Sequence, residues 1–159
     1  MRGALDFRHA RLLHYANEEN KMQIHYKYNF HFLREYFSMG KWTGPKVSGL
    51  DIETEGVLSP WDGAVATVQI ELNEDVYVVH LDEKQTLRKV AGVEHLVRYL
   101  TCPDVLKVIH NAVFEHTFFI HELSKVKTHP VWDTQIAEYD LAEGRSILGP
   151  DQYITPDVD

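Results

Sequence analysis

The order of secondary-structure patterns in the second part of the chain constrains the fold more than any other feature. Three β-rich segments with turn residues between them predict an antiparallel meander over 47–53, 64–72 and 75–81. A helical pattern over 92–100 and a β-branched strand over 105–109 come next. Antiparallel strands followed by a helix, another strand and further helices predict an α/β fold with a mixed sheet, and exclude an all-α or all-β fold.

Two further helices are predicted from residues that begin helices. Asn111 precedes a helical pattern that continues through Leu123, and Asp133 precedes another that continues through Leu141. Asn and Asp are typical N-cap residues because their side chains accept hydrogen bonds from the first backbone N–H groups of a helix. Both helices are therefore expected to flank the sheet.

The charge of the chain is unevenly distributed. Residues 1–46 hold eight Lys or Arg and four acids, a net charge of +4, whereas residues 47–159 hold eight and twenty, a net charge of -12. A body with this charge repels phosphate, so a nucleic-acid partner would require a basic arm or bound cations. We expect two units: a basic N-terminal extension over 1–45 and an α/β domain over 46–159.

The N-terminal extension is expected to be mainly helical. Tyr26, Phe30, Leu33 and Phe37 recur on one helical face, although aromatic residues from Tyr26 to Phe32 also alternate as they would in a strand. The helix is favoured because the apolar pattern lengthens toward Phe37. Such a segment could contact single-stranded nucleic acid through its basic and aromatic side chains, or pack on the sheet as an amphipathic pair. Gly and Pro predict a linker over 40–45.

A pair of carboxylates on the first predicted strand is the strongest candidate site. Asp51 and Glu53 are two residues apart, so on a strand they share a face and lie roughly 6.5–7 Å apart along it, opposite Leu50 and Ile52. Their mutual repulsion is relieved by a divalent cation bound between them. The alternative is that they form the solvated face of a half-exposed strand. Glu115, in the first turns of the helix after Asn111, also has a structural explanation, since acids there offset the helix macrodipole.

In combination these residues resemble the motifs of the DnaQ-like DEDD superfamily of 3′-5′ exonucleases. The matching strings are SGLDIETEG, VIHNAVFEHTFF and WDTQIAEYDLAEGR, and the likeness covers about residues 46–145. It is closest to the proofreading domains of bacterial and phage family A DNA polymerases. The resemblance implies an RNase H-like fold and hydrolysis of nucleotides from single-stranded DNA 3′ ends. It is also compatible with a polymerase or replication protein as partner.

The resemblance also implies roles for individual residues. Two ions, Mg²⁺ or Mn²⁺, would be held by four carboxylates, namely Asp51, Glu53, Glu115 and Asp157. Tyr153 would orient the attacking water as a further catalytic residue. The residues implied to contact substrate are Thr54, Asn111, Phe114 and His116. The Asp133-Thr134 pair matches a helix start that is mainly structural in the family.

The sequence departs from the family pattern in two places. Glu115 stands where the family usually has Asp, which adds one methylene and favours coordination through water. Tyr153 and Asp157 have the spacing of the last motif but lie closer to Asp133 than in the family, with Pro156 between them. Either the intervening segment is shorter, or the match is a coincidence in a truncated chain. The second case favours an alternative function, an impaired exonuclease-like module that binds nucleic acid or a protein.

Other site classes receive less support from the sequence. Neither the histidines nor Cys102 show the spacing of a zinc site, and no serine or cysteine has the setting of a catalytic nucleophile. The single cysteine and the charged first residues predict a reducing compartment, and we expect a cytoplasmic protein of a bacterium or a phage-infected host. The longest apolar runs fall well short of the roughly 18 residues that span a bilayer.

Overall fold

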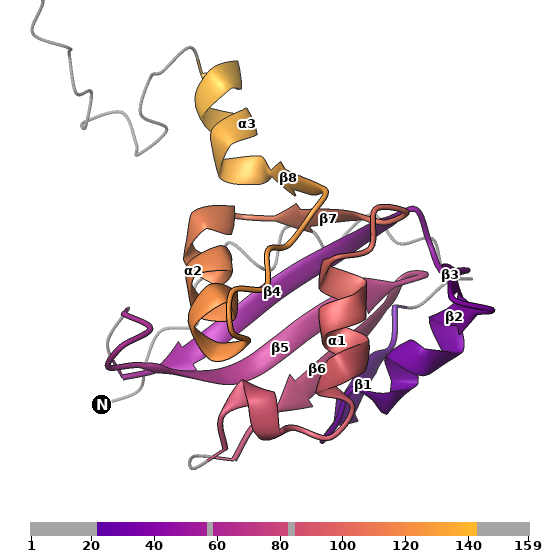
Figure 1. The fold of residues 1–159 in the computed structure, drawn as a ribbon. Coiled ribbons are helices and arrows are strands. Elements are labelled where there is room, and N and C mark those ends of the chain that lie inside the picture. Colours follow the sequence, from indigo (N-terminus) through magenta and orange to yellow (C-terminus); the bar gives the residue numbers. More distant parts are fainter. Residues whose placement is uncertain (1–21, 57–58, 83–84, 143–159) are drawn as a thin grey trace, which may run out of the picture.

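A computed structural model describes residues 22–56, 59–82 and 85–142. Its main feature is a six-stranded sheet in the order β1-β6-β5-β4-β7-β8 (Figure 1). The strands are β1 (Ile24–Lys27), β4 (Val47–Glu55), β5 (Ala64–Leu72), β6 (Asp75–His80), β7 (Leu106–Ile109) and β8 (Val131–Asp133). A two-stranded sheet is formed by β2 (Phe37–Ser38) and β3 (Lys41–Trp42).

The expected meander and the expected mixed sheet are both confirmed. β4 pairs antiparallel with β5, and β5 with β6, whereas β7 lies parallel to β4 on its other side and β8 parallel to β7. The predicted helices are also present as α1 (Val93–Leu100), α2 (Ala112–Glu122) and α3 (Thr134–Leu141). None of the helices in the described ranges is long and apolar enough to cross a bilayer.

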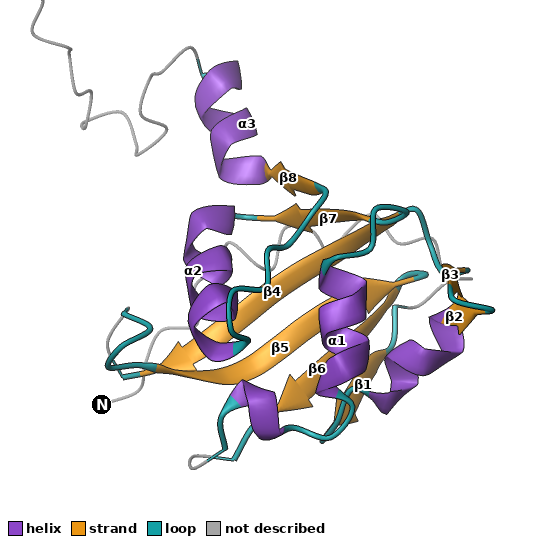
Figure 2. Ribbon diagram, in the orientation of Figure 1, coloured by secondary structure: helices purple, strands orange, loops and turns teal. Residues whose placement is uncertain are grey.

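One face of the sheet carries the hydrophobic core. Figure 2 shows α1 and α2 in front of the same face, and their side chains pack with those of the central strands. The alternation of β4 directs Leu50 and Ile52 into this core and leaves the residues between them on the opposite face. α3 stands beyond β8, away from the core, and has no buried residue. The β4 carboxylates Asp51 and Glu53 therefore lie on the sheet face opposite α1 and α2.

The expected helix over residues 26–37 is wrong. The chain instead forms the edge strand β1, parallel to β6, followed by the short 3-10 helix η2 (His31–Tyr36). The edge of β6 offers free backbone groups that β1 satisfies, so the alternating pattern prevails over the helical one. Phe30 and Leu33 are fully buried in the core of the sheet. The described part of the N-terminal extension is therefore continuous with the body of the protein.

The predicted linker over 40–45 is also wrong. Residues 37–42 form the β2–β3 hairpin, with positive φ at Met39 and Gly40 in its turn. Trp42 is only 6% exposed, and its Nε1 donates a hydrogen bond of 2.7 Å to the carbonyl oxygen of Pro45. A buried aromatic side chain anchors this segment, which the Gly and Pro content alone does not indicate.

A buried lysine connects β7 to the segment that leads into β8. Lys107 Nζ donates hydrogen bonds to the carbonyl oxygens of Cys102 and His129, at 2.7 and 2.6 Å. Burial disfavours the charged ammonium and lowers the pKa of Lys107 to about 8. These bonds fix the start of β8, whose last residue is Asp133.

Candidate active site

The two carboxylates of β4 share the open face of the sheet, as the sequence predicts. Asp51 is half-buried and Glu53 is exposed, while their neighbours Leu50 and Ile52 face the core. β4 lies between β5 and β7, near the middle of the sheet. The register of the β4–β5 ladder shifts directly after Glu53, between Glu53 and Thr54. Bulges of this kind re-aim side chains and are frequent beside active sites.

Gln69 is a neighbour of Asp51 that sequence reasoning missed. It lies opposite Asp51 in the antiparallel ladder, and its Nε2 donates a hydrogen bond of 3.3 Å to Asp51 Oδ2. Only the strand register brings the two together, so the sequence pattern holds no direct indication of this contact. Both residues line a pocket of about 280 Å³ whose other lining residues are Gly49, Leu50, Glu71, Val76, Val108 and His110.

Glu115 is the buried acid of the site. Its side chain comes from the first turn of α2, and the residue is only 3% exposed. Oε2 is buried and has no hydrogen-bond partner among the described residues. Burial, together with the charges of Asp51 and Asp133, raises the pKa of Glu115 to about 7, although a backbone hydrogen bond acts to lower it. Glu115 therefore lies within electrostatic range of Asp51 on β4.

Asp133 fixes the start of α2 as well as that of α3. Its carboxylate accepts hydrogen bonds from the backbone N–H groups of Gln135 and Ile136 at the start of α3. It also accepts bonds from Asn111 N at 3.1 Å and Ala112 N at 2.8 Å. Desolvation raises the pKa of this carboxyl, but the four N–H groups together lower it below its ordinary value. The predicted cap on α3 is confirmed.

The predicted cap on α2 needs a correction. Asn111 occupies the N-cap position, but its side chain makes no capping hydrogen bond and its backbone is left-handed, with φ of 64°. Asn adopts this conformation more readily than most residues. Asp133 instead accepts hydrogen bonds from the backbone N–H groups of Asn111 and Ala112, 22 and 21 residues earlier in the chain. The turn that carries Glu115 is thus held by β8.

The remaining predicted residues fall into different places. Thr54 is half-buried on β4 beyond the register shift, and Phe114 packs on the core with its ring 5.0 Å from that of Phe118. His116 lines a second pocket, of about 540 Å³, between α2 and α3, which also includes Asp133 and Trp132. Tyr153 and Asp157 lie outside the described residues.

The acidic residues fit a hard divalent cation in their chemistry. Carboxylate oxygens are the ligands that Mg²⁺ and Mn²⁺ prefer, and a buried carboxylate without a partner is stabilised by a cation. In the described ranges, however, Asp51, Glu53 and Glu115 do not form a group whose ligand atoms all lie within 4.8 Å of one another. Residues two positions apart on a strand already lie roughly 6.5–7 Å apart along it, so a cation held by all three acids would need side-chain rearrangement or bridging water.

Comparisons with known proteins identify similar structures. No protein-family model and no curated protein sequence matches the chain. Brucella melitensis NrnC with bound Mg²⁺ is similar with a TM-score of 0.60 and 25% identity, over 77% of this chain and 54% of that chain. NrnC bound to pGG is similar with a TM-score of 0.59 and 23% identity, over the same shares of the two chains, 77% and 54%.

More distant structures share the same fold. Escherichia coli RNase D, an exoribonuclease involved in structured RNA processing, has a TM-score of 0.52 and 14% identity, over 75% of this chain and 28% of that chain. The catalytic core of RRP6 from Trypanosoma brucei has a TM-score of 0.55 and 16% identity, over 76% and 31%. The chain spans about half the length of NrnC, 54%.

Proposed function

The chain has the fold of the DnaQ-like DEDD 3′-5′ exonucleases, the superfamily to which these similar structures belong, and from this premise we propose that it is a metal-dependent 3′-5′ exonuclease. Its substrate would be the 3′ end of a single-stranded nucleic acid. The observation that carries the proposal is that the buried carboxylate of Glu115 lies within electrostatic range of Asp51. The side chain of Asp51 is on the open face of the sheet.

The proposed site uses its carboxylates as metal ligands. Asp51, Glu53, Glu115 and Asp157 would hold two ions, Mg²⁺ or Mn²⁺, which when bound activate water and stabilise charge on the scissile phosphate. Gln69 would keep Asp51 in place through its hydrogen bond, and Tyr153 would orient water. The acid at Glu115 must lose its proton before it binds a cation, so its raised pKa links metal binding to pH.

The substrate end would be held by residues around these carboxylates. Thr54, Asn111, Phe114 and His116 are proposed to contact the terminal nucleotides, with the left-handed Asn111 at the start of α2. DNA is the proposed substrate, from the sequence likeness to proofreading domains. NrnC has been observed with pGG and RNase D is an exoribonuclease, so RNA is the alternative substrate of the same site.

A second candidate function is binding without cleavage. If Tyr153 and Asp157 do not reach β4, the site keeps three acids and the protein would act as an exonuclease-like module that binds nucleic acid or a protein. A polymerase or replication protein as partner, and a cytoplasmic place of action in a bacterium or an infected host, remain predictions from the sequence.

The decisive experiment is digestion of matched DNA and RNA oligonucleotides labelled at either end. With Mg²⁺ or Mn²⁺, a 5′-labelled strand should give a ladder of shortened products and a 3′-labelled strand should release mononucleotide at once. EDTA and Asp51→Asn should each abolish both signals. Asp104→Asn is a matched control, because it makes the same change in an exposed aspartate two residues before the start of β7.

Three outcomes separate the candidates. Metal-dependent shortening that disappears in Asp51→Asn supports the exonuclease, and the preferred oligonucleotide identifies DNA or RNA. If wild type and Asp51→Asn both bind the oligonucleotides and neither shortens them, the binding module is supported. Equal cleavage by wild type and Asp51→Asn would refute the assignment of the active site to Asp51 and its neighbours.

A further inference from the structure

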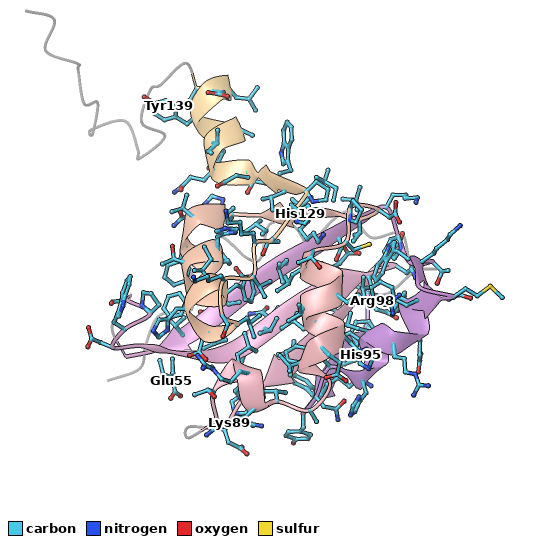
Figure 3. The ribbon with its side chains drawn as sticks, in the orientation of Figure 1. Glu55, Lys89, His95, Arg98, His129 and Tyr139 are labelled. Carbon is cyan, nitrogen blue, oxygen red and sulfur yellow. The ribbon has the colours of Figure 1, made fainter. Side chains whose placement is uncertain are left out.

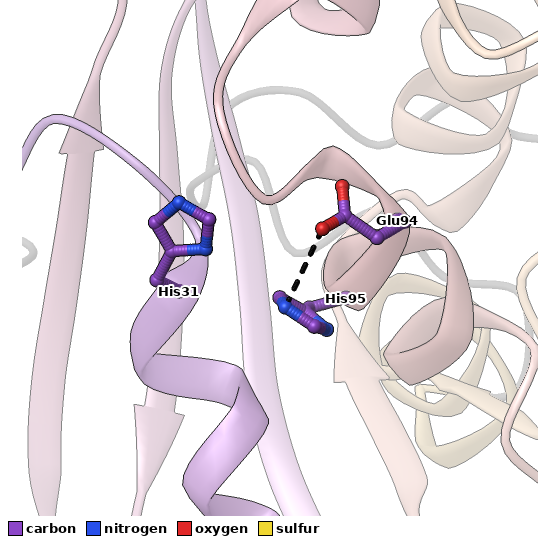
Figure 4. A group of neighbouring side chains, drawn as sticks. All are labelled: His31, Glu94 and His95. Atoms are coloured by element: carbon purple, nitrogen blue, oxygen red, sulfur yellow. Dashed lines mark ion pairs between the residues drawn. The ribbon is translucent and has the colours of Figure 1, made fainter.

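Three potential metal ligands lie together at the contact between η2 and α1. They are His31, the first residue of η2, and Glu94 and His95 in the first turn of α1. One ligand atom from each lies within 4.8 Å of the others, and Figure 4 shows the three side chains converging. Among the residues that the structure describes, no other group of three His, Cys, Asp or Glu residues meets this distance.

We propose that His31, Glu94 and His95 bind a divalent transition-metal ion of the Zn²⁺ class, at a site separate from the acidic residues of β4. Two imidazoles and one carboxylate are a ligand set that proteins use for Zn²⁺. Mg²⁺ binds oxygen ligands in preference to imidazole nitrogen, so this set selects against it. The chain would then carry two kinds of metal site, one of hard oxygen ligands and one that includes nitrogen.

One of the three ligand spacings already fits a tetrahedral ion. Zn²⁺ binds His nitrogen at about 2.0–2.1 Å and carboxylate oxygen at about 2.0–2.2 Å, which places tetrahedral ligand atoms roughly 3.3–3.5 Å apart. His95 Nε2 and Glu94 Oε1 are already 3.4 Å apart. His31 is exposed, so the proposed site would form when its side chain rotates to bring a ring nitrogen to the same spacing. Water would complete the coordination.

The backbone beneath the three residues is fixed. Phe30 N donates a hydrogen bond of 2.9 Å to the carbonyl oxygen of Ala91, and Phe30 is fully buried. Gly92 has φ of +78°, and a Cβ there would lie 2.9 Å from His31 N and 3.0 Å from the carbonyl carbon of Phe30. Only glycine fits this approach of the two segments. Ligands held on rigid backbone lose little freedom when they bind an ion, which favours binding.

The local charges favour a cation. The α1 N-terminus carries a partial positive charge that opposes one, but the Glu94 carboxylate is a full negative charge in the same turn. The side chain of Glu94 is 68% exposed, and that of His95 is 20% exposed, so the ion can enter from solvent. Bound there, the ion would link the segment after β1 to α1. The spacing rules for zinc motifs do not reveal this group, because its ligands come from two distant segments.

The experiment is a Zn²⁺ titration of the metal-stripped full chain in excess Mg²⁺, by calorimetry and by melting temperature. Wild type should bind Zn²⁺ and melt at a higher temperature with it. His31→Ala and His95→Ala should each weaken Zn²⁺ binding at least about 10-fold, the smallest loss typical of removing even a partner of a metal ligand. Glu94→Gln, an exposed substitution, tests the site without risk to folding.

Two controls make the test specific. His129→Ala removes an exposed histidine in a different part of the molecule from His95 (Figure 3), and this variant should bind Zn²⁺ as wild type does. Asp51→Asn should also keep this binding. Equal Zn²⁺ affinity in wild type, His31→Ala and Glu94→Gln would overturn the proposal. So would Zn²⁺ binding that Asp51→Asn removes and His31→Ala leaves intact. Neither readout uses nuclease activity, so the result is independent of the proposed function.

Discussion

The buried acid of the candidate site should make the stability of the metal-free protein depend on pH. The pKa of Glu115 is raised from 4.5 to about 7 by burial and by the charges of Asp51 and Asp133. Between these two values the folded protein holds a proton that the unfolded chain has lost. The stability contributed by protonated Glu115 is therefore fully present below about pH 4.5 and is lost as the pH rises through about 7.

The magnitude follows from the difference between the two pKa values. Each pKa unit corresponds to about 1.36 kcal/mol, so ionising Glu115 lowers the free energy of unfolding by at most about 3 kcal/mol. Glu115→Gln keeps the shape of the side chain and removes the charge. Near pH 5 the free energies of unfolding of the variant and of wild type should differ only by a constant offset. As the pH rises to 8, the variant should become progressively more stable relative to wild type.

Urea denaturation in EDTA, repeated at several pH values, measures this difference. The readout is the slope of the variant-minus-wild-type free energy against pH, which a constant packing cost does not change. Glu138→Gln makes the same change in an exposed glutamate of α3 and should leave the curve parallel to that of wild type. Parallel curves for Glu115→Gln would refute the assignment of Glu115 as the buried, protonated acid of the site.

Three further results are expected. Asp133→Ala removes the cap of both α2 and α3, and at about 0.5–2 kcal/mol per cap it should lower the free energy of unfolding by about 1–4 kcal/mol in chemical denaturation. Phe30→Ala should cost about 3–5 kcal/mol, because Phe30 is fully buried; a loss below about 1 kcal/mol would contradict a shared core. Mg²⁺ should raise the melting temperature more at pH 8 than at pH 6, because Glu115 must be deprotonated to act as a ligand, and an equal rise at both values would contradict that role.

Strands β4, β5, β6 and β7 and the first carboxylate pair could be predicted because they depend on neighbours in the sequence. The side-chain alternation along β4 places Asp51 and Glu53 on one face and Leu50 and Ile52 on the other, whatever the strand pairs with. The cap of α3 by Asp133 is equally local, since it joins residues within one turn. These elements required only relations between residues a few positions apart.

The N-terminal segment was predicted incorrectly because two periodicities overlap in it. Tyr26 and Phe30 satisfy both a helical and an alternating pattern, and no local property selects between them. The outcome depended on the edge of β6, about 50 residues away, where Ile24 pairs with Val76. The segment over 40–45, which was expected to be a linker, likewise contributes to the core, because the ring of Trp42 is buried there.

The sequence by itself determined the fold class, the central meander, the cap of α3 and the placement of Asp51 and Glu53 on one face, because periodicity and capping act over a few residues. Only the tertiary structure decided which of these groups meet. The hydrogen bond from Gln69 to Asp51, the second cap formed by Asp133 and the burial of Glu115 all join distant segments. Such contacts are set by strand register and packing, since the energy of a contact between distant segments is gained only after the chain between them has closed.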